Sequence, residues 1–272
     1  MPEVSDHHGE IDGMPVFWRE AEPAAGIGAT PLYVHGVPTS SLDWMPFLGA
    51  TGGIAPDLPG FGRSGKPGYL SYTMEEYDRY LERFLDERGL ERVSLIVHDW
   101  GAVGLLLAQR LPERVERIVV INAVPLLPGY RWHRTARIWR TAGLGELAMG
   151  TTNRFTLRLL TRESNVTPGP LPAEWIASTL ESFDQGTQRA ILRLYRSSPP
   201  ERLAAAGAHL GELGKPALVL WGTRDPYIPA RFGGEYAHAL GGELEEYPDA
   251  GHWAWLDRPD MVERVAAFLS GG

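Results

Sequence analysis

The chain has 272 residues, of which 43% are hydrophobic and 22% are charged. This composition is typical of a folded globular protein and excludes disordered and fibrous chains. The net charge of −8 argues against non-specific binding to nucleic acid and against docking on an anionic membrane, and the lack of cysteine excludes disulfides, thiolate metal sites and a cysteine nucleophile.

The sequence shows no sign of export or of a membrane anchor. Residues 1–17 carry four acidic side chains and lack the apolar core of a signal peptide. No apolar stretch approaches the roughly 20 residues that a spanning helix needs. We therefore expect a cytoplasmic protein with one large domain, whose partner is a small molecule rather than a membrane or a nucleic acid. The sequence is compatible with both a monomer and a homodimer.

Short apolar runs recur along the chain, and each ends at a polar residue or a glycine. The runs span residues 32–34, 94–97, 118–121 and 217–220. Because they are apolar nearly throughout instead of at every second residue, they predict strands buried on both faces. Amphipathic helical patterns at 74–88 and 102–111 lie between them. This alternation predicts βαβ units, and so a mostly parallel central sheet flanked by helices.

The alternation breaks between residues 125 and 214. Prolines punctuate amphipathic helical stretches there, such as 175–183 and 188–195. An excursion of this length inside a compact α/β domain usually covers a site. We therefore predict a core formed by residues 1–124 and 215–272, with residues 125–214 inserted between two strands as a helical cap.

The segment 97–102, Val-His-Asp-Trp-Gly-Ala, predicts a nucleophile elbow. A buried strand stops abruptly, one polar residue stands at the turn, and small residues open a helix because the strained backbone presses against its neighbours. Such an elbow usually holds serine, but no Gly-x-Ser-x-Gly segment occurs elsewhere in the chain. Asp99 is therefore the candidate nucleophile.

A carboxylate at the elbow implies a two-step reaction. It attacks an sp³ carbon that bears a leaving group and forms an ester with the enzyme, which water then hydrolyses. The second step needs a base. Asp225 follows the run 217–220, and His252 lies in a loop behind it, so the order of nucleophile, acid and histidine fits an elbow of this kind. Asp225 would fix the tautomer of His252 while the histidine activates water.

The ester hydrolysis also needs an oxyanion hole, and two backbone N–H groups are the candidates. One belongs to Trp100, the residue after the nucleophile, and the other to Val37 in the loop that follows the run 32–34. We assign His35 to holding that loop.

Two other patterns are interpreted as structural. Residues 60–65 fit Gly-x-Gly-x-x-Gly, but a Lys-Pro-Gly turn follows them where a nucleotide site would need a helix. His7 and His8 are adjacent on one strand, so they point in opposite directions. We assign no metal and no cofactor.

Over residues 17–269 the chain resembles the α/β-hydrolase superfamily. The resemblance rests on four segments: His-Gly-Val-Pro at 35–38, Asp-Leu-Pro-Gly-Phe-Gly-Arg-Ser at 57–64, His-Asp-Trp-Gly at 98–101 and Gly-His-Trp at 251–253. It implies the α/β-hydrolase fold, with a mostly parallel sheet flanked by helices and an inserted helical cap. Two branches share the His-Asp-Trp-Gly elbow, the epoxide hydrolases and the haloalkane dehalogenases.

The two branches treat the leaving group differently. Epoxide hydrolases hydrogen-bond the ring oxygen through cap tyrosines, and the segment around Tyr195 resembles one that carries such a tyrosine, with Tyr130 as the nearest candidate partner. Dehalogenases bind the halide through the tryptophan after the nucleophile, here Trp100, together with an asparagine or a second tryptophan. Val37 stands where many of them carry the asparagine and has no side-chain donor. Three tryptophans keep the dehalogenase alternative open: Trp132, Trp139 and Trp175.

The resemblance therefore favours an epoxide hydrolase. Asp99 would open an oxirane while Tyr195, with Tyr130, donates to the ring oxygen, and activated water would release a diol. Four aromatic residues predict an apolar wall and hence a hydrophobic small-molecule substrate: Trp44, Phe61, Trp100 and Trp253. The alternatives are a haloalkane dehalogenase with the same nucleophile and a non-catalytic protein that binds a ligand in the capped pocket.

Overall fold

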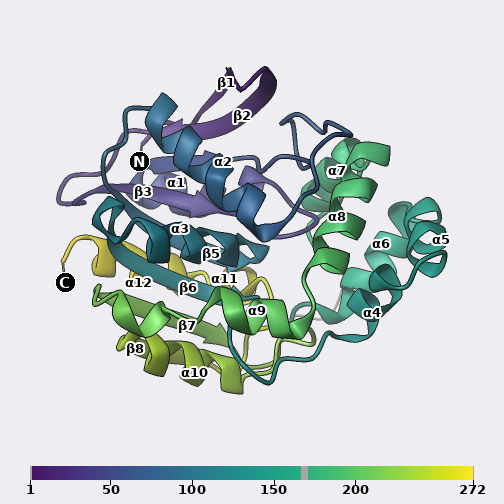
Figure 1. Ribbon diagram of the computed structural model, residues 1–272. Coiled ribbons are helices and arrows are strands. Elements are labelled where there is room, and N and C mark those ends of the chain that lie inside the picture. The colour runs from purple at the N-terminus through teal and green to yellow at the C-terminus, as the bar shows by residue number, and fades with distance from the viewer. Residues whose placement is uncertain (1, 167–170, 272) are drawn as a thin grey trace.

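The computed structural model describes residues 2–166 and 171–271, which build a central eight-stranded sheet (Figure 1). The strands lie in the order β1-β2-β4-β3-β5-β6-β7-β8. β2 pairs antiparallel with β1 and β4, and the pairs from β4 through β8 are parallel, which confirms the predicted sheet. The strands span Ser5–Ile11 (β1), Met14–Ala21 (β2), Thr30–Val34 (β3), Gly53–Pro56 (β4), Val93–Asp99 (β5), Val115–Ala123 (β6), Ala217–Gly222 (β7) and Glu243–Tyr247 (β8).

Helices cover both faces of this sheet, and a further set is inserted between β6 and β7 (Figure 1). The helices flanking the sheet span Met45–Thr51 (α1), Met74–Glu87 (α2), Gly104–Arg110 (α3), Arg231–Leu240 (α10), Ala254–Asp257 (α11) and Asp260–Leu269 (α12). The inserted helices span Arg134–Arg140 (α4), Leu144–Gly150 (α5), Arg154–Leu160 (α6), Ala173–Ser182 (α7), Gln185–Ser197 (α8) and Pro200–Ala206 (α9).

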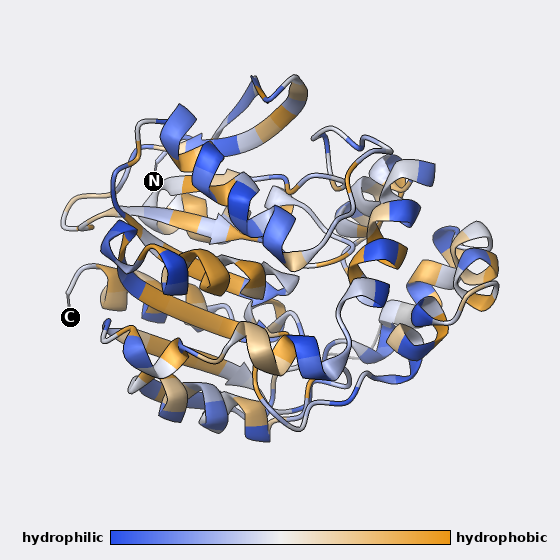
Figure 2. Cartoon of the chain, in the orientation of Figure 1, coloured by the Kyte–Doolittle hydropathy of each residue, from blue (hydrophilic) through white to orange (hydrophobic). Residues whose placement is uncertain are grey.

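Alternate residues of the central strands enter two hydrophobic cores. In β5, Leu95 and Val97 pack with residues of α2, α3 and α10, whereas Ile96 packs with residues of α1 and α12. All three side chains are fully buried. Figure 2 shows the same pattern, since β6 is hydrophobic through its middle while the outer side of α2 is hydrophilic. This burial on both faces explains why the strand sequences lack polar alternation.

The sequence located the central strands well and the edges poorly. The four apolar runs are confirmed as β3, β5, β6 and β7, and the helix expected over 74–88 is α2. The helix expected over 102–111 begins later, as α3, because Trp100–Val103 forms a 3₁₀ turn. The strand that holds His7 and His8 is β1, whereas the edge strand β8 was not expected, since most of its side chains are exposed and form no apolar run.

The inserted helices present an unusual surface. Residues 131–162 hold seven arginines and one glutamate, in a chain whose net charge is −8. That glutamate, Glu146, is ion-paired with Arg196 at 2.7 Å. Large apolar side chains are exposed on the same helices: Ile138, Leu144, Leu147, Phe155 and Leu159. Figure 1 places α4, α5 and α6 at the edge of the molecule far from the two chain ends. None of the helices in the described residues is both long and apolar enough to cross a membrane.

Candidate active site

Asp99 is the last residue of β5, where the chain turns sharply into the 3₁₀ helix. Its φ of 50° and ψ of −123° lie in a region that few residues other than glycine adopt. A Cβ on Gly101 would lie 2.0 Å from the carbonyl oxygen of Val34, and one on Gly36 would lie 2.5 Å from the Cβ of Asp99. The flanking glycines therefore allow the close approach that the turn needs.

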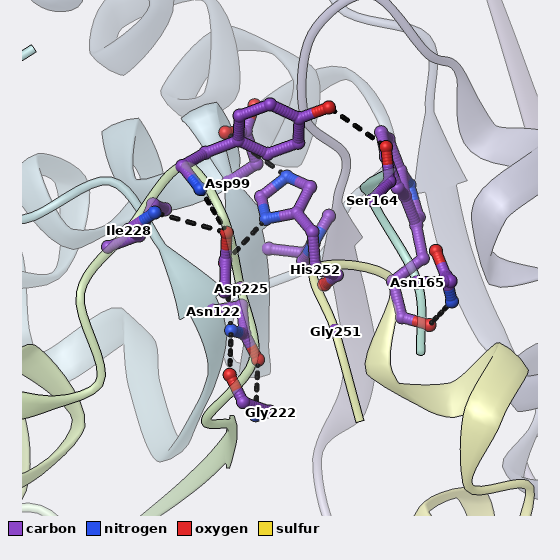
Figure 3. Close-up of polar contacts among 12 residues, drawn as sticks. Asp99, Asn122, Ser164, Asn165, Gly222, Asp225, Ile228, Gly251 and His252 are labelled. Carbon is purple, nitrogen blue, oxygen red and sulfur yellow. Dashed lines mark hydrogen bonds and ion pairs between the residues drawn. The ribbon is translucent and has the colours of Figure 1, made fainter. Parts of the chain in front are cut away.

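His252 and Asp225 lie beside Asp99 (Figure 3). Asp225 follows β7, and its Oδ2 accepts a hydrogen bond of 2.7 Å from Nδ1 of His252. The other ring nitrogen, Nε2, lies 3.6 Å from Oδ2 of Asp99. All three side chains are buried. The structure thus brings the three predicted residues together, with the imidazole held between two carboxylates.

Backbone N–H groups hold the Asp99 carboxylate from the side of the elbow and the β3 loop. The N–H of Val37 donates to Oδ1 at 2.8 Å, and the N–H of Trp100 also bonds the carboxylate. This pair matches the expected oxyanion hole in position. His35 takes no part, because both of its ring nitrogens are bonded to backbone groups of the surrounding loops.

The electrostatic environment separates the roles of the two titrating residues. Burial raises the pKa of Asp99 above that of an ordinary carboxyl group, while the charge of His252 and the backbone N–H groups oppose this rise. Burial by itself would lower the pKa of His252, but the charge of Asp225 and its hydrogen bond outweigh burial and raise that pKa. The two neighbouring carboxylates therefore make His252 a stronger base than a free imidazole.

Asn122 holds the Asp225 carboxylate that bonds His252, and it was not among the predicted site residues. It stands near the end of β6, and its Nδ2 donates to Oδ2 of Asp225 at 2.9 Å. Its Oδ1 accepts the N–H of Gly222 at 2.8 Å, which ties β6 to β7 (Figure 3). The sequence feature that could have identified Asn122 is a polar residue at the carboxyl end of an apolar strand. Asn122 therefore fixes the carboxylate that orients His252.

A cavity of about 190 Å³ opens onto the Asp99 carboxylate. The sheet side contributes Asp99, His252 and Trp253 to its lining. The side formed by the inserted helices is mainly apolar: Ile138, Trp139, Leu157, Phe183, Ile191 and Tyr195. This lining suits a small hydrophobic molecule.

The two candidate tyrosines lie in different places. Tyr195 in α8 lines the cavity, and burial raises its pKa well above the ordinary value, so the hydroxyl keeps its proton and can donate. Tyr130 does not line the cavity, and its hydroxyl donates to the carbonyl oxygen of Tyr227 at 3.4 Å. Tyr130, in the loop before α4, packs on Trp132 and Phe232 and does not line the cavity beside Tyr195 as the expected tyrosine pair requires.

The candidate halide-binding tryptophans differ in whether their indole N–H groups are already hydrogen-bonded within the protein. The indole N–H of Trp132 donates to Ser198 O at 3.0 Å and that of Trp175 to Asp43 at 2.9 Å, so neither is available to a ligand. Trp139 lines the cavity. The buried indole N–H of Trp100 makes no well-aligned hydrogen bond to any residue in the described part of the chain, although the Tyr195 ring lies 5.1 Å away between centroids.

Only one of the four residues of the predicted apolar wall lines the cavity. That residue is Trp253, whereas Trp100 does not line the cavity and packs edge-on against the ring of Tyr195. Trp44 instead stacks on Trp255 in the hydrophobic core, and Phe61 packs against His35. Both are large aromatic residues buried in the hydrophobic core, and the sequence pattern could not distinguish such residues from residues that line a cavity.

Two further groups near the site were not anticipated. Tyr227 lines the cavity, and its ring packs edge-on against His252 at 5.0 Å. Asp43 is a buried carboxylate whose pKa burial raises to about 6, and it accepts the indole N–H groups of Trp175 and Trp253.

The two patterns interpreted as structural are accounted for. Residues 60–65 form turns with no helix after them, and His7 stacks on Trp18 while His8 packs on Phe17. Within residues 2–166 and 171–271, no three His, Asp or Glu side chains gather as a metal site would require.

Comparison with known proteins agrees with this geometry. The model of the alpha/beta hydrolase fold family matches residues 32–259. A haloalkane dehalogenase from Mesorhizobium japonicum is 32% identical over 90% of this chain and 85% of its own. Haloalkane dehalogenase 1 from Mycobacterium tuberculosis is 31% identical over 86% of this chain and 82% of its own. The crystal structure of a haloalkane dehalogenase from Bradyrhizobium elkani superposes with a TM-score of 0.85 at 29% identity, covering 99% of this chain and 98% of that one.

The chain belongs to the α/β-hydrolase fold family. Within it, these similarities support the aspartate-nucleophile branch of the haloalkane dehalogenase type, and they support a hydrolase. The expected fold, an α/β-hydrolase sheet flanked by helices, is confirmed. The preference for an epoxide hydrolase is not supported, and the dehalogenase alternative fits the relatives better. That preference rested on two cap tyrosines, of which only Tyr195 reaches the cavity.

Proposed function

We propose that the protein is a haloalkane dehalogenase that hydrolyses small apolar haloalkanes through an ester of Asp99. One observation carries the proposal. A buried carboxylate faces an apolar cavity with Oδ1 held by the backbone N–H of Val37 and Oδ2 near the base His252. Residues 125–214 then act as a cap over the core of residues 1–124 and 215–272.

The first step forms the ester. Oδ2 of Asp99 attacks the carbon that carries the halogen, the carbon–halogen bond breaks, and the halide leaves with the bonding electron pair. The N–H group of Val37 holds Oδ1 and that of Trp100 also bonds the carboxylate, so the attacking oxygen is oriented before substrate arrives. His252 takes no part in this step.

The second step releases the product. His252 takes a proton from water, and the oxygen of that water attacks the carbonyl carbon of the ester. The N–H groups of Val37 and Trp100 stabilise the oxyanion, and Asp225 stabilises the imidazolium. Collapse of the intermediate yields the alcohol and restores the Asp99 carboxylate, so the net products are alcohol, halide and a proton.

The leaving group needs donors that Val37 cannot supply. The indole of Trp100 follows Asp99 directly in the chain and packs against Tyr195, which keeps its hydroxyl proton and lines the cavity together with Trp139. We assign Trp100 and Tyr195 as the principal halide donors, with Trp139 beside them. Tyr195 thus keeps a functional role, but it donates to a halide instead of to the epoxide oxygen that its sequence position suggested.

The test uses His252→Gln, which should form the ester but not hydrolyse it. We expect intact-mass spectrometry after incubation with 1-bromohexane to show an added hexyl group, and the double variant with Asp99→Ala to show none. An adduct with an aryl epoxide of the whole epoxide mass, and none with the bromoalkane, would favour the epoxide hydrolase. Ligand binding with no adduct and no turnover by the wild-type protein would instead support a non-catalytic receptor.

A further inference from the structure

The catalytic histidine lies in a short irregular loop, and a segment of the cap is bonded directly to it. The backbone N–H of His252 donates to the carbonyl oxygen of Ser164 at 2.7 Å. A Cβ on Gly251 would lie 2.2 Å from that same oxygen, so the two backbones are in the closest contact that glycine allows. Figure 3 shows Ser164 and Asn165 next to Gly251 and His252.

Asp257, at the end of α11, connects the two segments from the other side. Its Oδ2 accepts the N–H of Gly251 at 2.9 Å and the N–H of Val166 at 3.0 Å. It also accepts Nδ2 of Asn165 at 3.1 Å, and the same Nδ2 donates to the carbonyl oxygen of Trp253 at 3.1 Å. One carboxylate oxygen thus ties the residues on both sides of His252 to the cap. We call Ser164, Asn165, Val166 and Asp257 the histidine clasp.

We propose that Asp257 and Asn165 are positioning residues for His252 in the hydrolysis of the ester. The inference rests on the proposed function. Within residues 2–166 and 171–271, one bond besides the clasp holds the backbone of His252, from Nε2 of the core residue His98 to its carbonyl oxygen at 3.0 Å. The clasp bonds the residues before and after it, and so restrains the plane in which the imidazole lies.

The clasp acts on one half of the reaction. Attack by Asp99 does not use His252, so its rate depends on the elbow and the halide donors. Activation of water needs Nε2 of His252 in place, and small displacements of a catalytic group cost large factors in rate. Loss of the clasp should therefore slow ester hydrolysis and leave ester formation unchanged.

The experiment measures the two steps separately. Asn165→Ala, Asp257→Asn and Asp257→Ala are mixed with 1-bromohexane in a rapid-quench instrument, and halide release and the mass of the ester are followed. Asp260→Asn is the matched control, because it removes an exposed carboxylate three residues away that pairs with Arg258. We expect the bromide burst to keep its rate within about twofold and ester hydrolysis to slow by about 10-fold in Asn165→Ala and about 100-fold in Asp257→Ala.

The conservative variant adds a graded readout. Asp257→Asn keeps one acceptor oxygen, so its hydrolysis rate should fall between those of wild type and Asp257→Ala. If Asp257→Ala does not fold, Asn165→Ala decides the question. Unchanged hydrolysis in folded variants, or equal slowing of both steps, would overturn the proposal.

A second measurement needs no substrate and separates this inference from the proposed function. NMR titration of the His252 ring in wild type and Asn165→Ala reports how well Nδ1 is held by Asp225. We expect its pKa to fall towards that of a free histidine in Asn165→Ala and to stay unchanged in Asp260→Asn. A wild-type protein that forms no ester would refute the dehalogenase, and an unshifted pKa in Asn165→Ala would refute the clasp.

Discussion

The cavity has two walls of different construction. The core wall comes from the ends of parallel strands that are bonded on both sides, and Asp99, Asp225 and His252 are at most 9% exposed there. The cap wall comes largely from α4, α5 and α6, each of seven residues, on which Phe155 is 75% exposed and Leu147 is 65% exposed. Helices of two turns are marginal without tertiary packing. The groups that carry the bond-making steps thus lie on the rigid wall, and most of the apolar side chains that would contact the substrate lie on the less rigid one.

A pair of glycine substitutions tests this difference in rigidity most strongly. In Gly101→Ala the new methyl group meets the Val34 carbonyl oxygen at 2.0 Å, and we expect a loss of about 3 kcal/mol or more in the free energy of unfolding. In Gly150→Ala, at the end of α5, nothing lies within 4 Å, and a gain of up to about 1 kcal/mol should follow from helix propensity. Urea denaturation followed by circular dichroism measures both. Equal losses would show that the cap is packed as tightly as the core.

The support behind the core wall is the next target. Asn122→Ala removes the amide that holds Oδ2 of Asp225, and a hydrogen bond to a charged group contributes about 1.5–3 kcal/mol, so ester hydrolysis should slow by about 10- to 100-fold. Asn153→Ala in the cap is the control, because its side chain only caps α6. Single-turnover kinetics with 1-bromohexane gives the hydrolysis rate. A normal rate in Asn122→Ala would mean that Asp225 is held without it.

The pH profile tests the charges on the core wall. Below the raised pKa of His252 the imidazolium has no free nitrogen to accept a proton from water, so ester hydrolysis should fall about tenfold for each pH unit as the pH decreases. Ester formation should persist to lower pH, until Asp99 is protonated, at a pKa that burial raises above the ordinary carboxyl value. Stopped-flow bromide release at several pH values separates the two steps. A single shared pH dependence would contradict the assignment of His252 to the second step.

A substitution on the cap wall should have the smallest effect. Tyr195→Phe removes one halide donor and leaves Trp100, so we expect ester formation to slow by about fivefold to tenfold with hydrolysis unchanged. Tyr130→Phe is the matched control, because its hydroxyl bonds a carbonyl outside the cavity. Bromide burst rates of the two variants give the comparison. Similar rates of ester formation in both variants would mean that the tryptophans, and not Tyr195, donate to the halide.

The contrast between the two cavity walls also explains which site residues could be predicted from the sequence. Asp99, Asp225 and His252 were found because strand ends, glycines and chain order mark them locally. Asn122 and Asp257 act through contacts with segments about 100 residues or 91 residues away, and no local pattern records such pairs. Tyr130 and Trp44 were misplaced because an aromatic residue has the same local signature in a core and in a cavity wall. Helical periodicity identified α7 and α8 but not which of their faces meets the site.

The arginines of the cap have a consequence for the electric field of the molecule. Seven arginines and one glutamate give residues 131–162 a net charge of +6, so the rest of the chain carries −14. Positive charge is therefore concentrated at the end of the molecule formed by these helices, and Arg134 contributes from there to the lining of the cavity. Because the proposed reaction sends a halide out past this end, the field retards its escape, and it reaches only about one Debye length, about 8 Å at physiological ionic strength. Added salt should thus ease the departure of the anion while weakening the attraction of anionic solutes to the same end.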